Sequence, residues 1–265
     1  MKITANMVTR TFAAALIFSM VFILRIHRET SAAQEPVRVA VAANLSDVIG
    51  ELVVSFKGAH PEISIEVITG SSGKLATQII HGAPYDIFLS ADMDSPEALY
   101  SRHLAADRPA LYAMGTLILF TTRELPLSKG MDLTRATEVK RIALADPSSA
   151  PYGRAAVEAM KNAGVYSAAA PKLVNAPSVS QVIPFTSSGA DIGFTALSLL
   201  KAPWMRKYDV RGKYWMEVDN GLYAPIKQGM VILARAKNRS DVRSFYTFLS
   251  SEKAKISFRK YGYKL

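Results

Sequence analysis

The sequence predicts an α/β protein built from two lobes. Apolar strand-like runs alternate with helix-like runs along the chain, which is the pattern of βαβ units and of a parallel sheet covered by helices. The alternation starts after residue 36 and starts again after residue 116, and the chain ends with further apolar strand and helix material. We therefore expect two sheets, with the chain crossing between them near residues 113–117 and 225–229.

The first lobe is expected to contain two consecutive βαβ steps. Val48, Leu52, Val53 and Phe56 recur at helical spacing, so a helix should follow the first strand directly. The elements predicted here are a strand at 37–42, a helix at 46–60, a strand at 63–68, a helix at 74–81 and a strand at 85–90. Such units receive ligands at the carboxyl ends of their strands.

The second lobe repeats the scheme with different partners. Its predicted elements are strands at 117–120, 142–145 and 191–194, with helices at 152–160 and 195–200. The chain should then return through a strand at 230–234 and finish with helices at 242–249 and 251–261.

Three short polar clusters each lie between a predicted strand and a predicted helix. They are Ala42-Ala43-Asn44-Leu45-Ser46, Gly70-Ser71-Ser72-Gly73-Lys74-Leu75 and Ala150-Pro151-Tyr152-Gly153. A helix N-terminus offers unpaired backbone NH groups and a partial positive charge. Several such starts that meet at one cleft would bind a small anion without any lysine or arginine.

The N-terminus predicts export. Lys2 and Arg10 precede the apolar run 11–24, and Ser31-Ala32-Ala33 supplies the small residues that a signal peptidase reads before Gln34. Residues 1–33 are therefore expected to be a signal peptide. The charged cluster at residues 25–29 leaves an uncleaved membrane anchor as the alternative, and either arrangement places the folded part outside the cytoplasm.

Composition excludes several function classes. The chain has no cysteine, which removes disulfides, thiolate metal sites and a cysteine nucleophile. Its formal charge is +10, but the basic residues are scattered, so we expect no nucleic-acid partner. His60, His81 and His103 lie far apart, and neither a Gly-x-Ser-x-Gly elbow nor a His-Glu-x-x-His motif is present, so we expect neither an enzyme nor a direct metal site.

Five segments resemble the periplasmic molybdate-binding proteins (ModA) of ABC importers. They are Val39-Ala40-Val41-Ala42-Ala43-Asn44-Leu45, Gly70-Ser71-Ser72-Gly73-Lys74-Leu75, Gly82-Ala83-Pro84-Tyr85-Asp86-Ile87-Phe88-Leu89-Ser90-Ala91-Asp92, Asp146-Pro147 with Ala150-Pro151-Tyr152-Gly153, and Tyr261-Gly262-Tyr263. The resemblance covers residues 37–263. It implies a two-lobed type II periplasmic binding fold with a ligand cleft between lobes formed by 34–115 with 227–265 and by 116–226.

The resemblance also implies the ligand and the residues that bind it. The ligand would be the oxyanion molybdate or tungstate, held by hydrogen bonds with no direct metal ligand and no cofactor. The binding residues would be Ala43, Asn44, Ser72, Tyr152 and Val179, with Ser71 and Ser178 as neighbouring candidates. The protein would then deliver the ion as a periplasmic monomer to an ABC permease.

Phe194 departs from the family pattern. Many relatives place a ligand tyrosine there, and phenylalanine cannot donate a hydrogen bond, so we expect Tyr152 to supply the missing donor. A receptor for sulfate or another tetrahedral oxyanion is therefore the alternative, and a regulatory or adhesive module with the same fold is a further one.

Plainer roles remain open for several of these residues. Asn44 and Ser72 could be helix N-caps. Tyr152 could be a packing aromatic, and Lys74 could point to solvent. Asp86 and Asp92 are expected to make structural hydrogen bonds, because carboxylates near a dianion would repel it.

Overall fold

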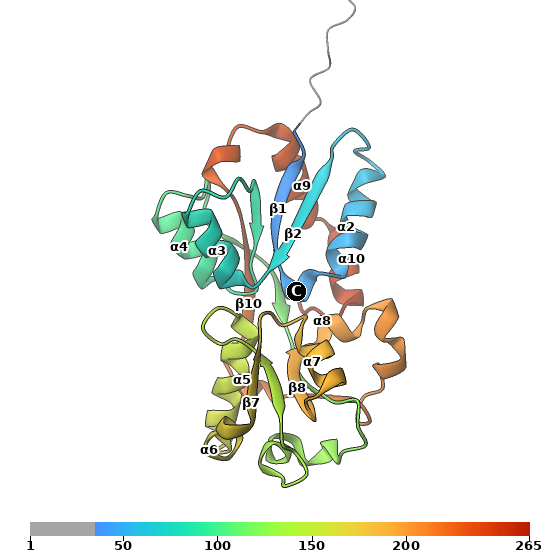
Figure 1. Cartoon of the computed structure of the whole chain (residues 1–265). Helices are drawn as coiled ribbons and strands as arrows, with labels where there is room; N and C mark the ends of the chain where they lie inside the picture. Colours follow the sequence, from blue (N-terminus) through green and yellow to red (C-terminus); the bar gives the residue numbers. More distant parts are fainter. Residues whose placement is uncertain (1–34) are drawn as a thin grey trace, which may run out of the picture. The chain divides into compact units, whose positions relative to one another are not determined.

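Two five-stranded sheets, each flanked by helices, form the part of the chain that the structure describes (Figure 1). The structure is a computed structural model and describes residues 35–265. Residues Pro36–Leu265 form one compact unit. The predicted signal peptide, residues 1–33, lies outside the described residues. Within residues 35–265, no helix combines the length and the apolar character needed to cross a membrane.

The first sheet has the strand order β2-β1-β3-β10-β4. Its strands are β1 (Val37–Ala42), β2 (Ile65–Gly70), β3 (Ile87–Leu89), β4 (Ala110–Gly115) and β10 (Ile226–Ile232). β1 pairs in parallel with β2 and β3, whereas β10 is antiparallel to both β3 and β4.

Helices cover both faces of this sheet (Figure 1). One face packs against α2 (Val48–Lys57), α9 (Ser240–Leu249) and α10 (Glu252–Lys260), and the other against α3 (Ser72–Ile80) and α4 (Asp94–Ser101). Side chains alternate along β1, so Val39 and Val41 join the first cluster while Ala40 joins the second.

The second sheet has the strand order β7-β6-β8-β5-β9. Its strands are β5 (Leu117–Phe120), β6 (Ile142–Ala145), β7 (Leu173–Ala176), β8 (Ile192–Ala196) and β9 (Trp215–Glu217), and its helices are α5 (Pro151–Asn162), α6 (Tyr166–Ala169), α7 (Val182–Ser188) and α8 (Leu197–Leu200). β6 pairs in parallel with β7 and β8, and β5 is antiparallel to β8 and β9.

Short 3-10 helices complete the described elements. They are η1 (Ala43–Leu45), η2 (Leu127–Arg135), η3 (Ala170–Lys172), η4 (Pro203–Tyr208), η5 (Asn220–Leu222) and η6 (Ala234–Ala236).

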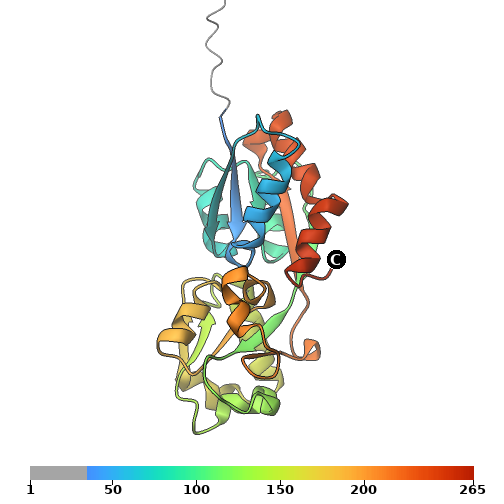
Figure 2. The ribbon, with the colours of Figure 1, turned by 90° about the vertical axis from the view of Figure 1, so that its right-hand side faces the viewer.

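The chain passes between the two sheets at two places. Only Thr116 separates β4 from β5, and residues 218–225 connect β9 to β10. The C-terminal end lies beside the boundary between the sheets, as the turned view shows (Figure 2). Because residues 36–265 form one compact unit, the division into lobes at residues 115/116 and 226/227 stays a prediction.

Several predicted elements match the observed ones. β1, β5 and β6 have the predicted bounds, because each is an uninterrupted apolar run between polar residues. The predicted helix 46–60 was wrong at its start, where the 3-10 helix η1 precedes α2. The predicted helix 195–200 begins instead at Leu197, because Thr195 still pairs with Ile118 in the second sheet. β4, β7 and β9 were not predicted.

Asp86 is buried and ties three parts of the first sheet together. Its Oδ2 accepts from the Arg38 backbone NH at 2.8 Å and lies 3.1 Å from Arg239, and its Oδ1 lies 2.9 Å from Arg235. The structural role expected for this carboxylate is therefore observed. It links the start of β1 to the segment that follows β10.

We expect Asp86→Ala to lower the free energy of unfolding by about 3 kcal/mol, because a buried NH and two guanidinium groups lose their acceptor. Urea denaturation measures this. Glu66→Gln is the matched control: Glu66 pairs with Arg38 at the surface, so its loss should cost no more than about 0.5 kcal/mol. Equal effects of the two substitutions would contradict the role given to Asp86.

Candidate functional site

A small cavity lies where the two sheets meet. Its lining consists of Ala42, Ala43, Asn44, Ser71, Ser72, Ala91, Ala150, Pro151, Tyr152 and Val179. About 10 Å³ is open to the centre of a water-sized sphere, which is close to the room that one water molecule needs. In this form of the protein the cavity holds little more than one water molecule, so a larger ion would enter only if the surrounding groups moved apart.

The structure brings together most of the predicted site residues. Ala43, Asn44, Ser72, Tyr152 and Val179 all line this cavity, and so does Ser71. Ser178 does not line it, and the Ser178 hydroxyl lies 3.1 Å from that of Ser180. Phe194 is also absent from the lining, because β8 buries it between its neighbours Leu119 and Leu144.

The first turns of three helices contribute residues to the cavity lining. Ala43 and Asn44 belong to η1, Ser72 begins α3, and Tyr152 is the second residue of α5. Ala150 is extended before Pro151, as a residue preceding proline prefers, so the chain turns sharply into α5. None of the three helices has a side-chain hydrogen bond at its N-cap. First-turn NH groups lack intrahelical acceptors, so this end of each helix favours an anion.

Ser72 is not an N-cap, contrary to the plainer of its two predicted roles. Its hydroxyl oxygen accepts from the backbone NH of Ala91, two residues beyond the end of β3, at 2.9 Å. Among the described residues, the Ser72 hydroxyl proton meets no acceptor. This arrangement holds the hydroxyl in place while leaving its proton available to a ligand.

Asn44 is likewise not an N-cap, because a buried polar network binds its side chain. Nδ2 of Asn44 donates to Oε1 of Gln228 and to the hydroxyl of Tyr263, at 2.9 Å in both contacts. Gln228 is completely buried in β10. Its Oε1 also lies 2.8 Å from the hydroxyl of Tyr112, and its Nε2 lies 3.3 Å from the hydroxyl of Tyr152.

The hydroxyl of Tyr152 is therefore directed at Gln228. That the Tyr152 hydroxyl replaces the donor lost at Phe194 stays a prediction. A ligand would meet the first turn of α5, where the backbone NH of Tyr152 has no intrahelical acceptor. The sequence does not predict the roles of Gln228 and Tyr263, because their separation from Asn44, 184 and 219 residues, leaves no local signal.

Burial raises the pKa of the network tyrosines. Desolvation is the main cause at Tyr112, Tyr152 and Tyr263, and in each case the neighbouring tyrosines or acidic groups raise the pKa further. All three hydroxyls therefore keep their protons at neutral pH. The network is uncharged and works by hydrogen bonds alone.

Each sheet together with its flanking helices is called a sheet assembly here. Contacts between the two sheet assemblies lie around the cavity. The backbone NH of Gly73 donates to the carbonyl of Ser149 at 2.9 Å, and the Ser198 hydroxyl donates to the Asn44 carbonyl at 2.8 Å. Arg154 of α5 forms an ion pair with Asp92, whose second oxygen accepts from the Ser90 hydroxyl at 2.8 Å. The structural hydrogen bonding expected of Asp92 is observed.

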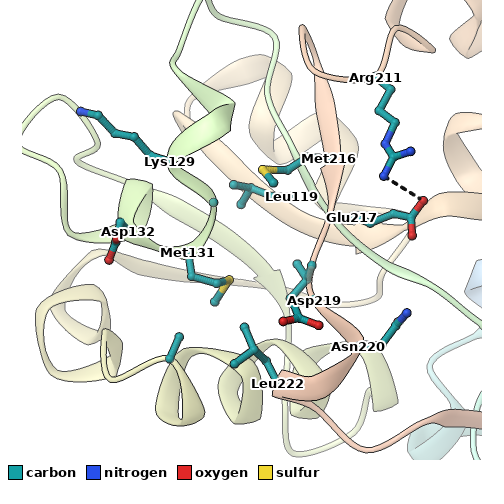
Figure 3. A pocket seen from close by; sticks show the side chains of 13 residues that line it. Leu119, Lys129, Met131, Asp132, Arg211, Met216, Glu217, Asp219, Asn220 and Leu222 are labelled. Atoms are coloured by element: carbon teal, nitrogen blue, oxygen red, sulfur yellow. Dashed lines mark ion pairs between the residues drawn. The ribbon is translucent and has the colours of Figure 1, made fainter.

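A much larger cavity of about 530 Å³ lies in the second sheet assembly (Figure 3). Its labelled lining mixes apolar and charged side chains: Leu119, Met131, Met216, Leu222, Lys129, Asp132, Arg211, Glu217 and Asp219. Arg211 is 3.6 Å from Glu217, so part of its charge is already compensated. None of the predicted site residues lines this cavity, and no group of helix starts meets there. The small cavity is therefore the candidate site.

No group of three or more histidine, cysteine, aspartate or glutamate residues within 35–265 is arranged to hold a metal ion. The small cavity has no charged side chain in its lining. Its polar groups are hydroxyls, one carboxamide and backbone NH groups. Such a set binds an anion through neutral donors and cannot ligate a cation strongly.

Comparisons with known proteins point the same way. Residues 37–264 match the family model described as bacterial extracellular solute-binding protein. The chain is 37% identical over 237 residues to the molybdate-binding protein ModA of Rhodobacter capsulatus, a match covering 88% of this chain and 89% of that one. It is 32% identical over 233 residues to ModA of Azotobacter vinelandii, covering 86% and 90% respectively.

The fold has a solved counterpart. The periplasmic molybdate-binding protein of Azotobacter vinelandii superposes with a TM-score of 0.79 at 28% identity, over 86% of this chain and 99% of that chain. The predicted α/β fold class is thereby confirmed. The matching family binds solutes, which also confirms the expectation of a non-enzymatic protein.

We expect the free energy of unfolding to fall as the pH rises above about 10. Unfolded tyrosines ionise near pH 10, whereas the buried ones retain their protons, so the unfolded state then binds fewer protons and gains stability. Each buried tyrosine should contribute up to about 1.4 kcal/mol per pH unit. Below pH 9 this contribution is constant.

Urea denaturation of Tyr112→Phe between pH 8 and 11 measures that contribution, and the decline should be shallower than in the wild type. Tyr100→Phe, at a more exposed position on α4, controls for loss of a hydroxyl without deep burial. Parallel pH profiles of the unfolding free energy for wild type and Tyr112→Phe would contradict a raised pKa of Tyr112 in the folded protein.

Proposed function

Because this chain belongs to the ModA molybdate-binding family of bacterial extracellular solute-binding proteins, we propose that it captures molybdate or tungstate and delivers the ion to an ABC importer. The binding residues in this proposal are Ala43, Asn44, Ser72, Tyr152 and Val179. Ser71 also lines the cavity, whereas Ser178 does not, so Ser178 has a weaker claim.

The observation that carries the proposal is the meeting of uncapped helix starts in one cavity with an uncharged lining. A tetrahedral dianion presents only acceptors, and backbone NH groups with the Ser72 hydroxyl are matching donors. These donors are fixed by the fold, so binding does not require a lysine or arginine to be desolvated. The basic character of the chain favours the approach of anions from solution.

Ligand size and protonation give the site its selectivity in this proposal. Molybdate and tungstate are nearly equal in size and larger than sulfate, so a fitted cavity separates sulfate from both. Phosphate retains a proton near neutral pH, and a donor facing that proton would lose its acceptor. A donor-only site therefore rejects phosphate.

Delivery requires the two sheet assemblies to open and close around the site. We place the hinge at Thr116 and at residues 218–225, where the chain passes between the sheets. The contacts of Gly73 with Ser149 and of Arg154 with Asp92 would form on closure. The closed monomer would then dock on a membrane permease from the periplasmic side, after export directed by residues 1–33.

We expect Ser72→Ala to weaken molybdate binding about tenfold, because one hydrogen bond to a charged ligand is lost. Asn44→Ala should weaken it at least as much. Isothermal titration calorimetry on residues 34–265, freed of bound ion, measures both values. Ser46→Ala, two residues beyond Asn44 but outside the cavity lining, is the matched control and should leave the affinity unchanged.

Unchanged affinity in both Ser72→Ala and Asn44→Ala would refute the site assignment. The same titrations with sulfate and phosphate separate the ligand alternatives. A wild-type protein that ignores molybdate but binds sulfate tightly would keep the fold and change the cargo.

Gly73→Ala tests closure. A Cβ at residue 73 would lie 2.9 Å from the Ser149 carbonyl oxygen and 3.1 Å from its Cα, and both are backbone atoms that cannot turn away. We expect at least a tenfold loss of molybdate affinity with little change in the thermal stability of the ligand-free protein. Gly50→Ala in α2 meets nothing within 4 Å and is the control that should retain full affinity. Wild-type affinity in Gly73→Ala would rule out this close approach in the bound state.

A further inference from the structure

The side-chain amide of Asn44 has partners on one side only. Its nitrogen donates to Gln228 and Tyr263, while its oxygen, Oδ1, is buried and has no hydrogen-bond partner among the described residues. Asn44 is 1% exposed and lines the small cavity. Since the two protein partners lie on the nitrogen side, we infer that Oδ1 is the atom turned toward the cavity. An acceptor in that place would repel an oxyanion that carries no proton.

The hydrogen count around Gln228 shows a second mismatch. The Tyr112 hydroxyl lies 2.9 Å from the carbonyl oxygen of Ser90 and 2.8 Å from Oε1 of Gln228. A hydroxyl has one proton, so it can serve only one of these two acceptors. Oε1 and the Tyr112 oxygen therefore face each other whenever the proton is given to Ser90.

A half-turn of both carboxamides removes both mismatches. Nε2 of Gln228 would then donate to Oδ1 of Asn44 and to the Tyr112 oxygen, and the Tyr112 proton would go to Ser90. The Tyr152 hydroxyl would donate to Oε1 of Gln228. Rotating a carboxamide exchanges its donor and acceptor at nearly the same positions, so the packing is unchanged.

The surrounding groups tolerate this exchange. The Asn44 carbonyl accepts from both Ser198, at 2.8 Å, and Tyr263, at 2.9 Å. Ser198 alone can satisfy that carbonyl, so the Tyr263 proton is free to turn to Oδ1 of Asn44. The Asn44 NH₂ group would then face the cavity with both protons available.

We propose that Gln228 is a positioning residue for selectivity: its carboxamide sets the orientation of the Asn44 amide and so decides whether the cavity presents a donor or an acceptor. The wild-type pair turns its NH₂ group to a fully deprotonated oxyanion. Gln228 acts through Asn44 and is not itself in the cavity lining. This inference rests on the proposed function, because it assumes that the cavity binds an oxyanion.

Gln228→Glu tests the proposal. An ionised glutamate only accepts hydrogen bonds, so it would keep the Asn44 NH₂ group on its own side and fix Oδ1 toward the ligand. The decisive quantity is the ratio of molybdate to phosphate affinity, measured by isothermal titration calorimetry at pH 8. Both ions are then dianions, so the added charge of the glutamate affects them alike, and only phosphate carries a proton for Oδ1.

We expect Gln228→Glu to reduce the ratio of molybdate to phosphate affinity at least tenfold, with sulfate following molybdate. Lys227→Gln is the matched control: it lies next to Gln228 on β10, is exposed, and changes the net charge by the same single unit. Its ratio should equal that of the wild type.

Gln228→Met is the second variant, which serves if Gln228→Glu does not fold in a thermal unfolding assay. It removes the constraint without adding charge and should reduce the ratio in the same direction. Side-chain NMR gives a readout that a purely structural role would not change. The Asn44 NH₂ resonance, assigned by its loss in Asn44→Ala, should shift when molybdate binds the wild type.

The outcomes separate the two proposals. A wild-type protein that binds no oxyanion overturns the proposed function and this inference with it. A wild type that binds molybdate, with an unchanged affinity ratio in the folded Gln228 variants, overturns the inference alone.

Discussion

The hydrogen bond between Asn44 and Gln228 is the contact on which the rest of the site depends. It joins the turn after β1 to β10, and β10 is the strand by which the chain returns to the first sheet. Tyr263 attaches the C-terminal end to the same amide, and Tyr152 brings in the start of α5 from the second sheet assembly. A buried polar network is stabilising only when its members are satisfied together, so each of these elements constrains the others.

The electrostatic potential of the site is determined by the absence of charged side chains from the cavity lining. The cavity lining has no ionisable side chain except the buried phenol of Tyr152, whose pKa is raised by burial. The carboxylate of Asp92, which follows Ala91 of the cavity lining, is paired with Arg154 and accepts from the Ser90 hydroxyl. Backbone dipoles and neutral donors are left to define the potential inside the cavity, and both favour an anion.

The sequence alone determined the alternating α/β pattern, the three helix starts and most of the cavity lining. β1, β5 and β6 could be predicted because each is a continuous apolar run. The helix starts carry their own signals, such as the residue before Pro151 and the Gly-Ser-Ser-Gly segment that spans the start of α3. Resemblance to a family then selected Asn44, Ser72, Tyr152 and Val179 from these turns. Local patterns of this kind depend on neighbours within a few residues, so they can be recognised in the sequence alone.

Only the tertiary structure decided how those residues are used. β4, β7 and β9 become strands through their pairing with β10, β6 and β5, which are distant or differently patterned segments of the chain. Asn44 and Ser72 have the residue types of N-caps, yet each is bound by a group distant in the sequence, Gln228 for one and Ala91 for the other. The direction of the Tyr152 hydroxyl and the need for glycine at Gly73 likewise follow from atoms across the sheet boundary. Hydrogen-bond partners are determined by three-dimensional proximity. At separations of 100 residues or more, that proximity cannot be recognised from a single sequence.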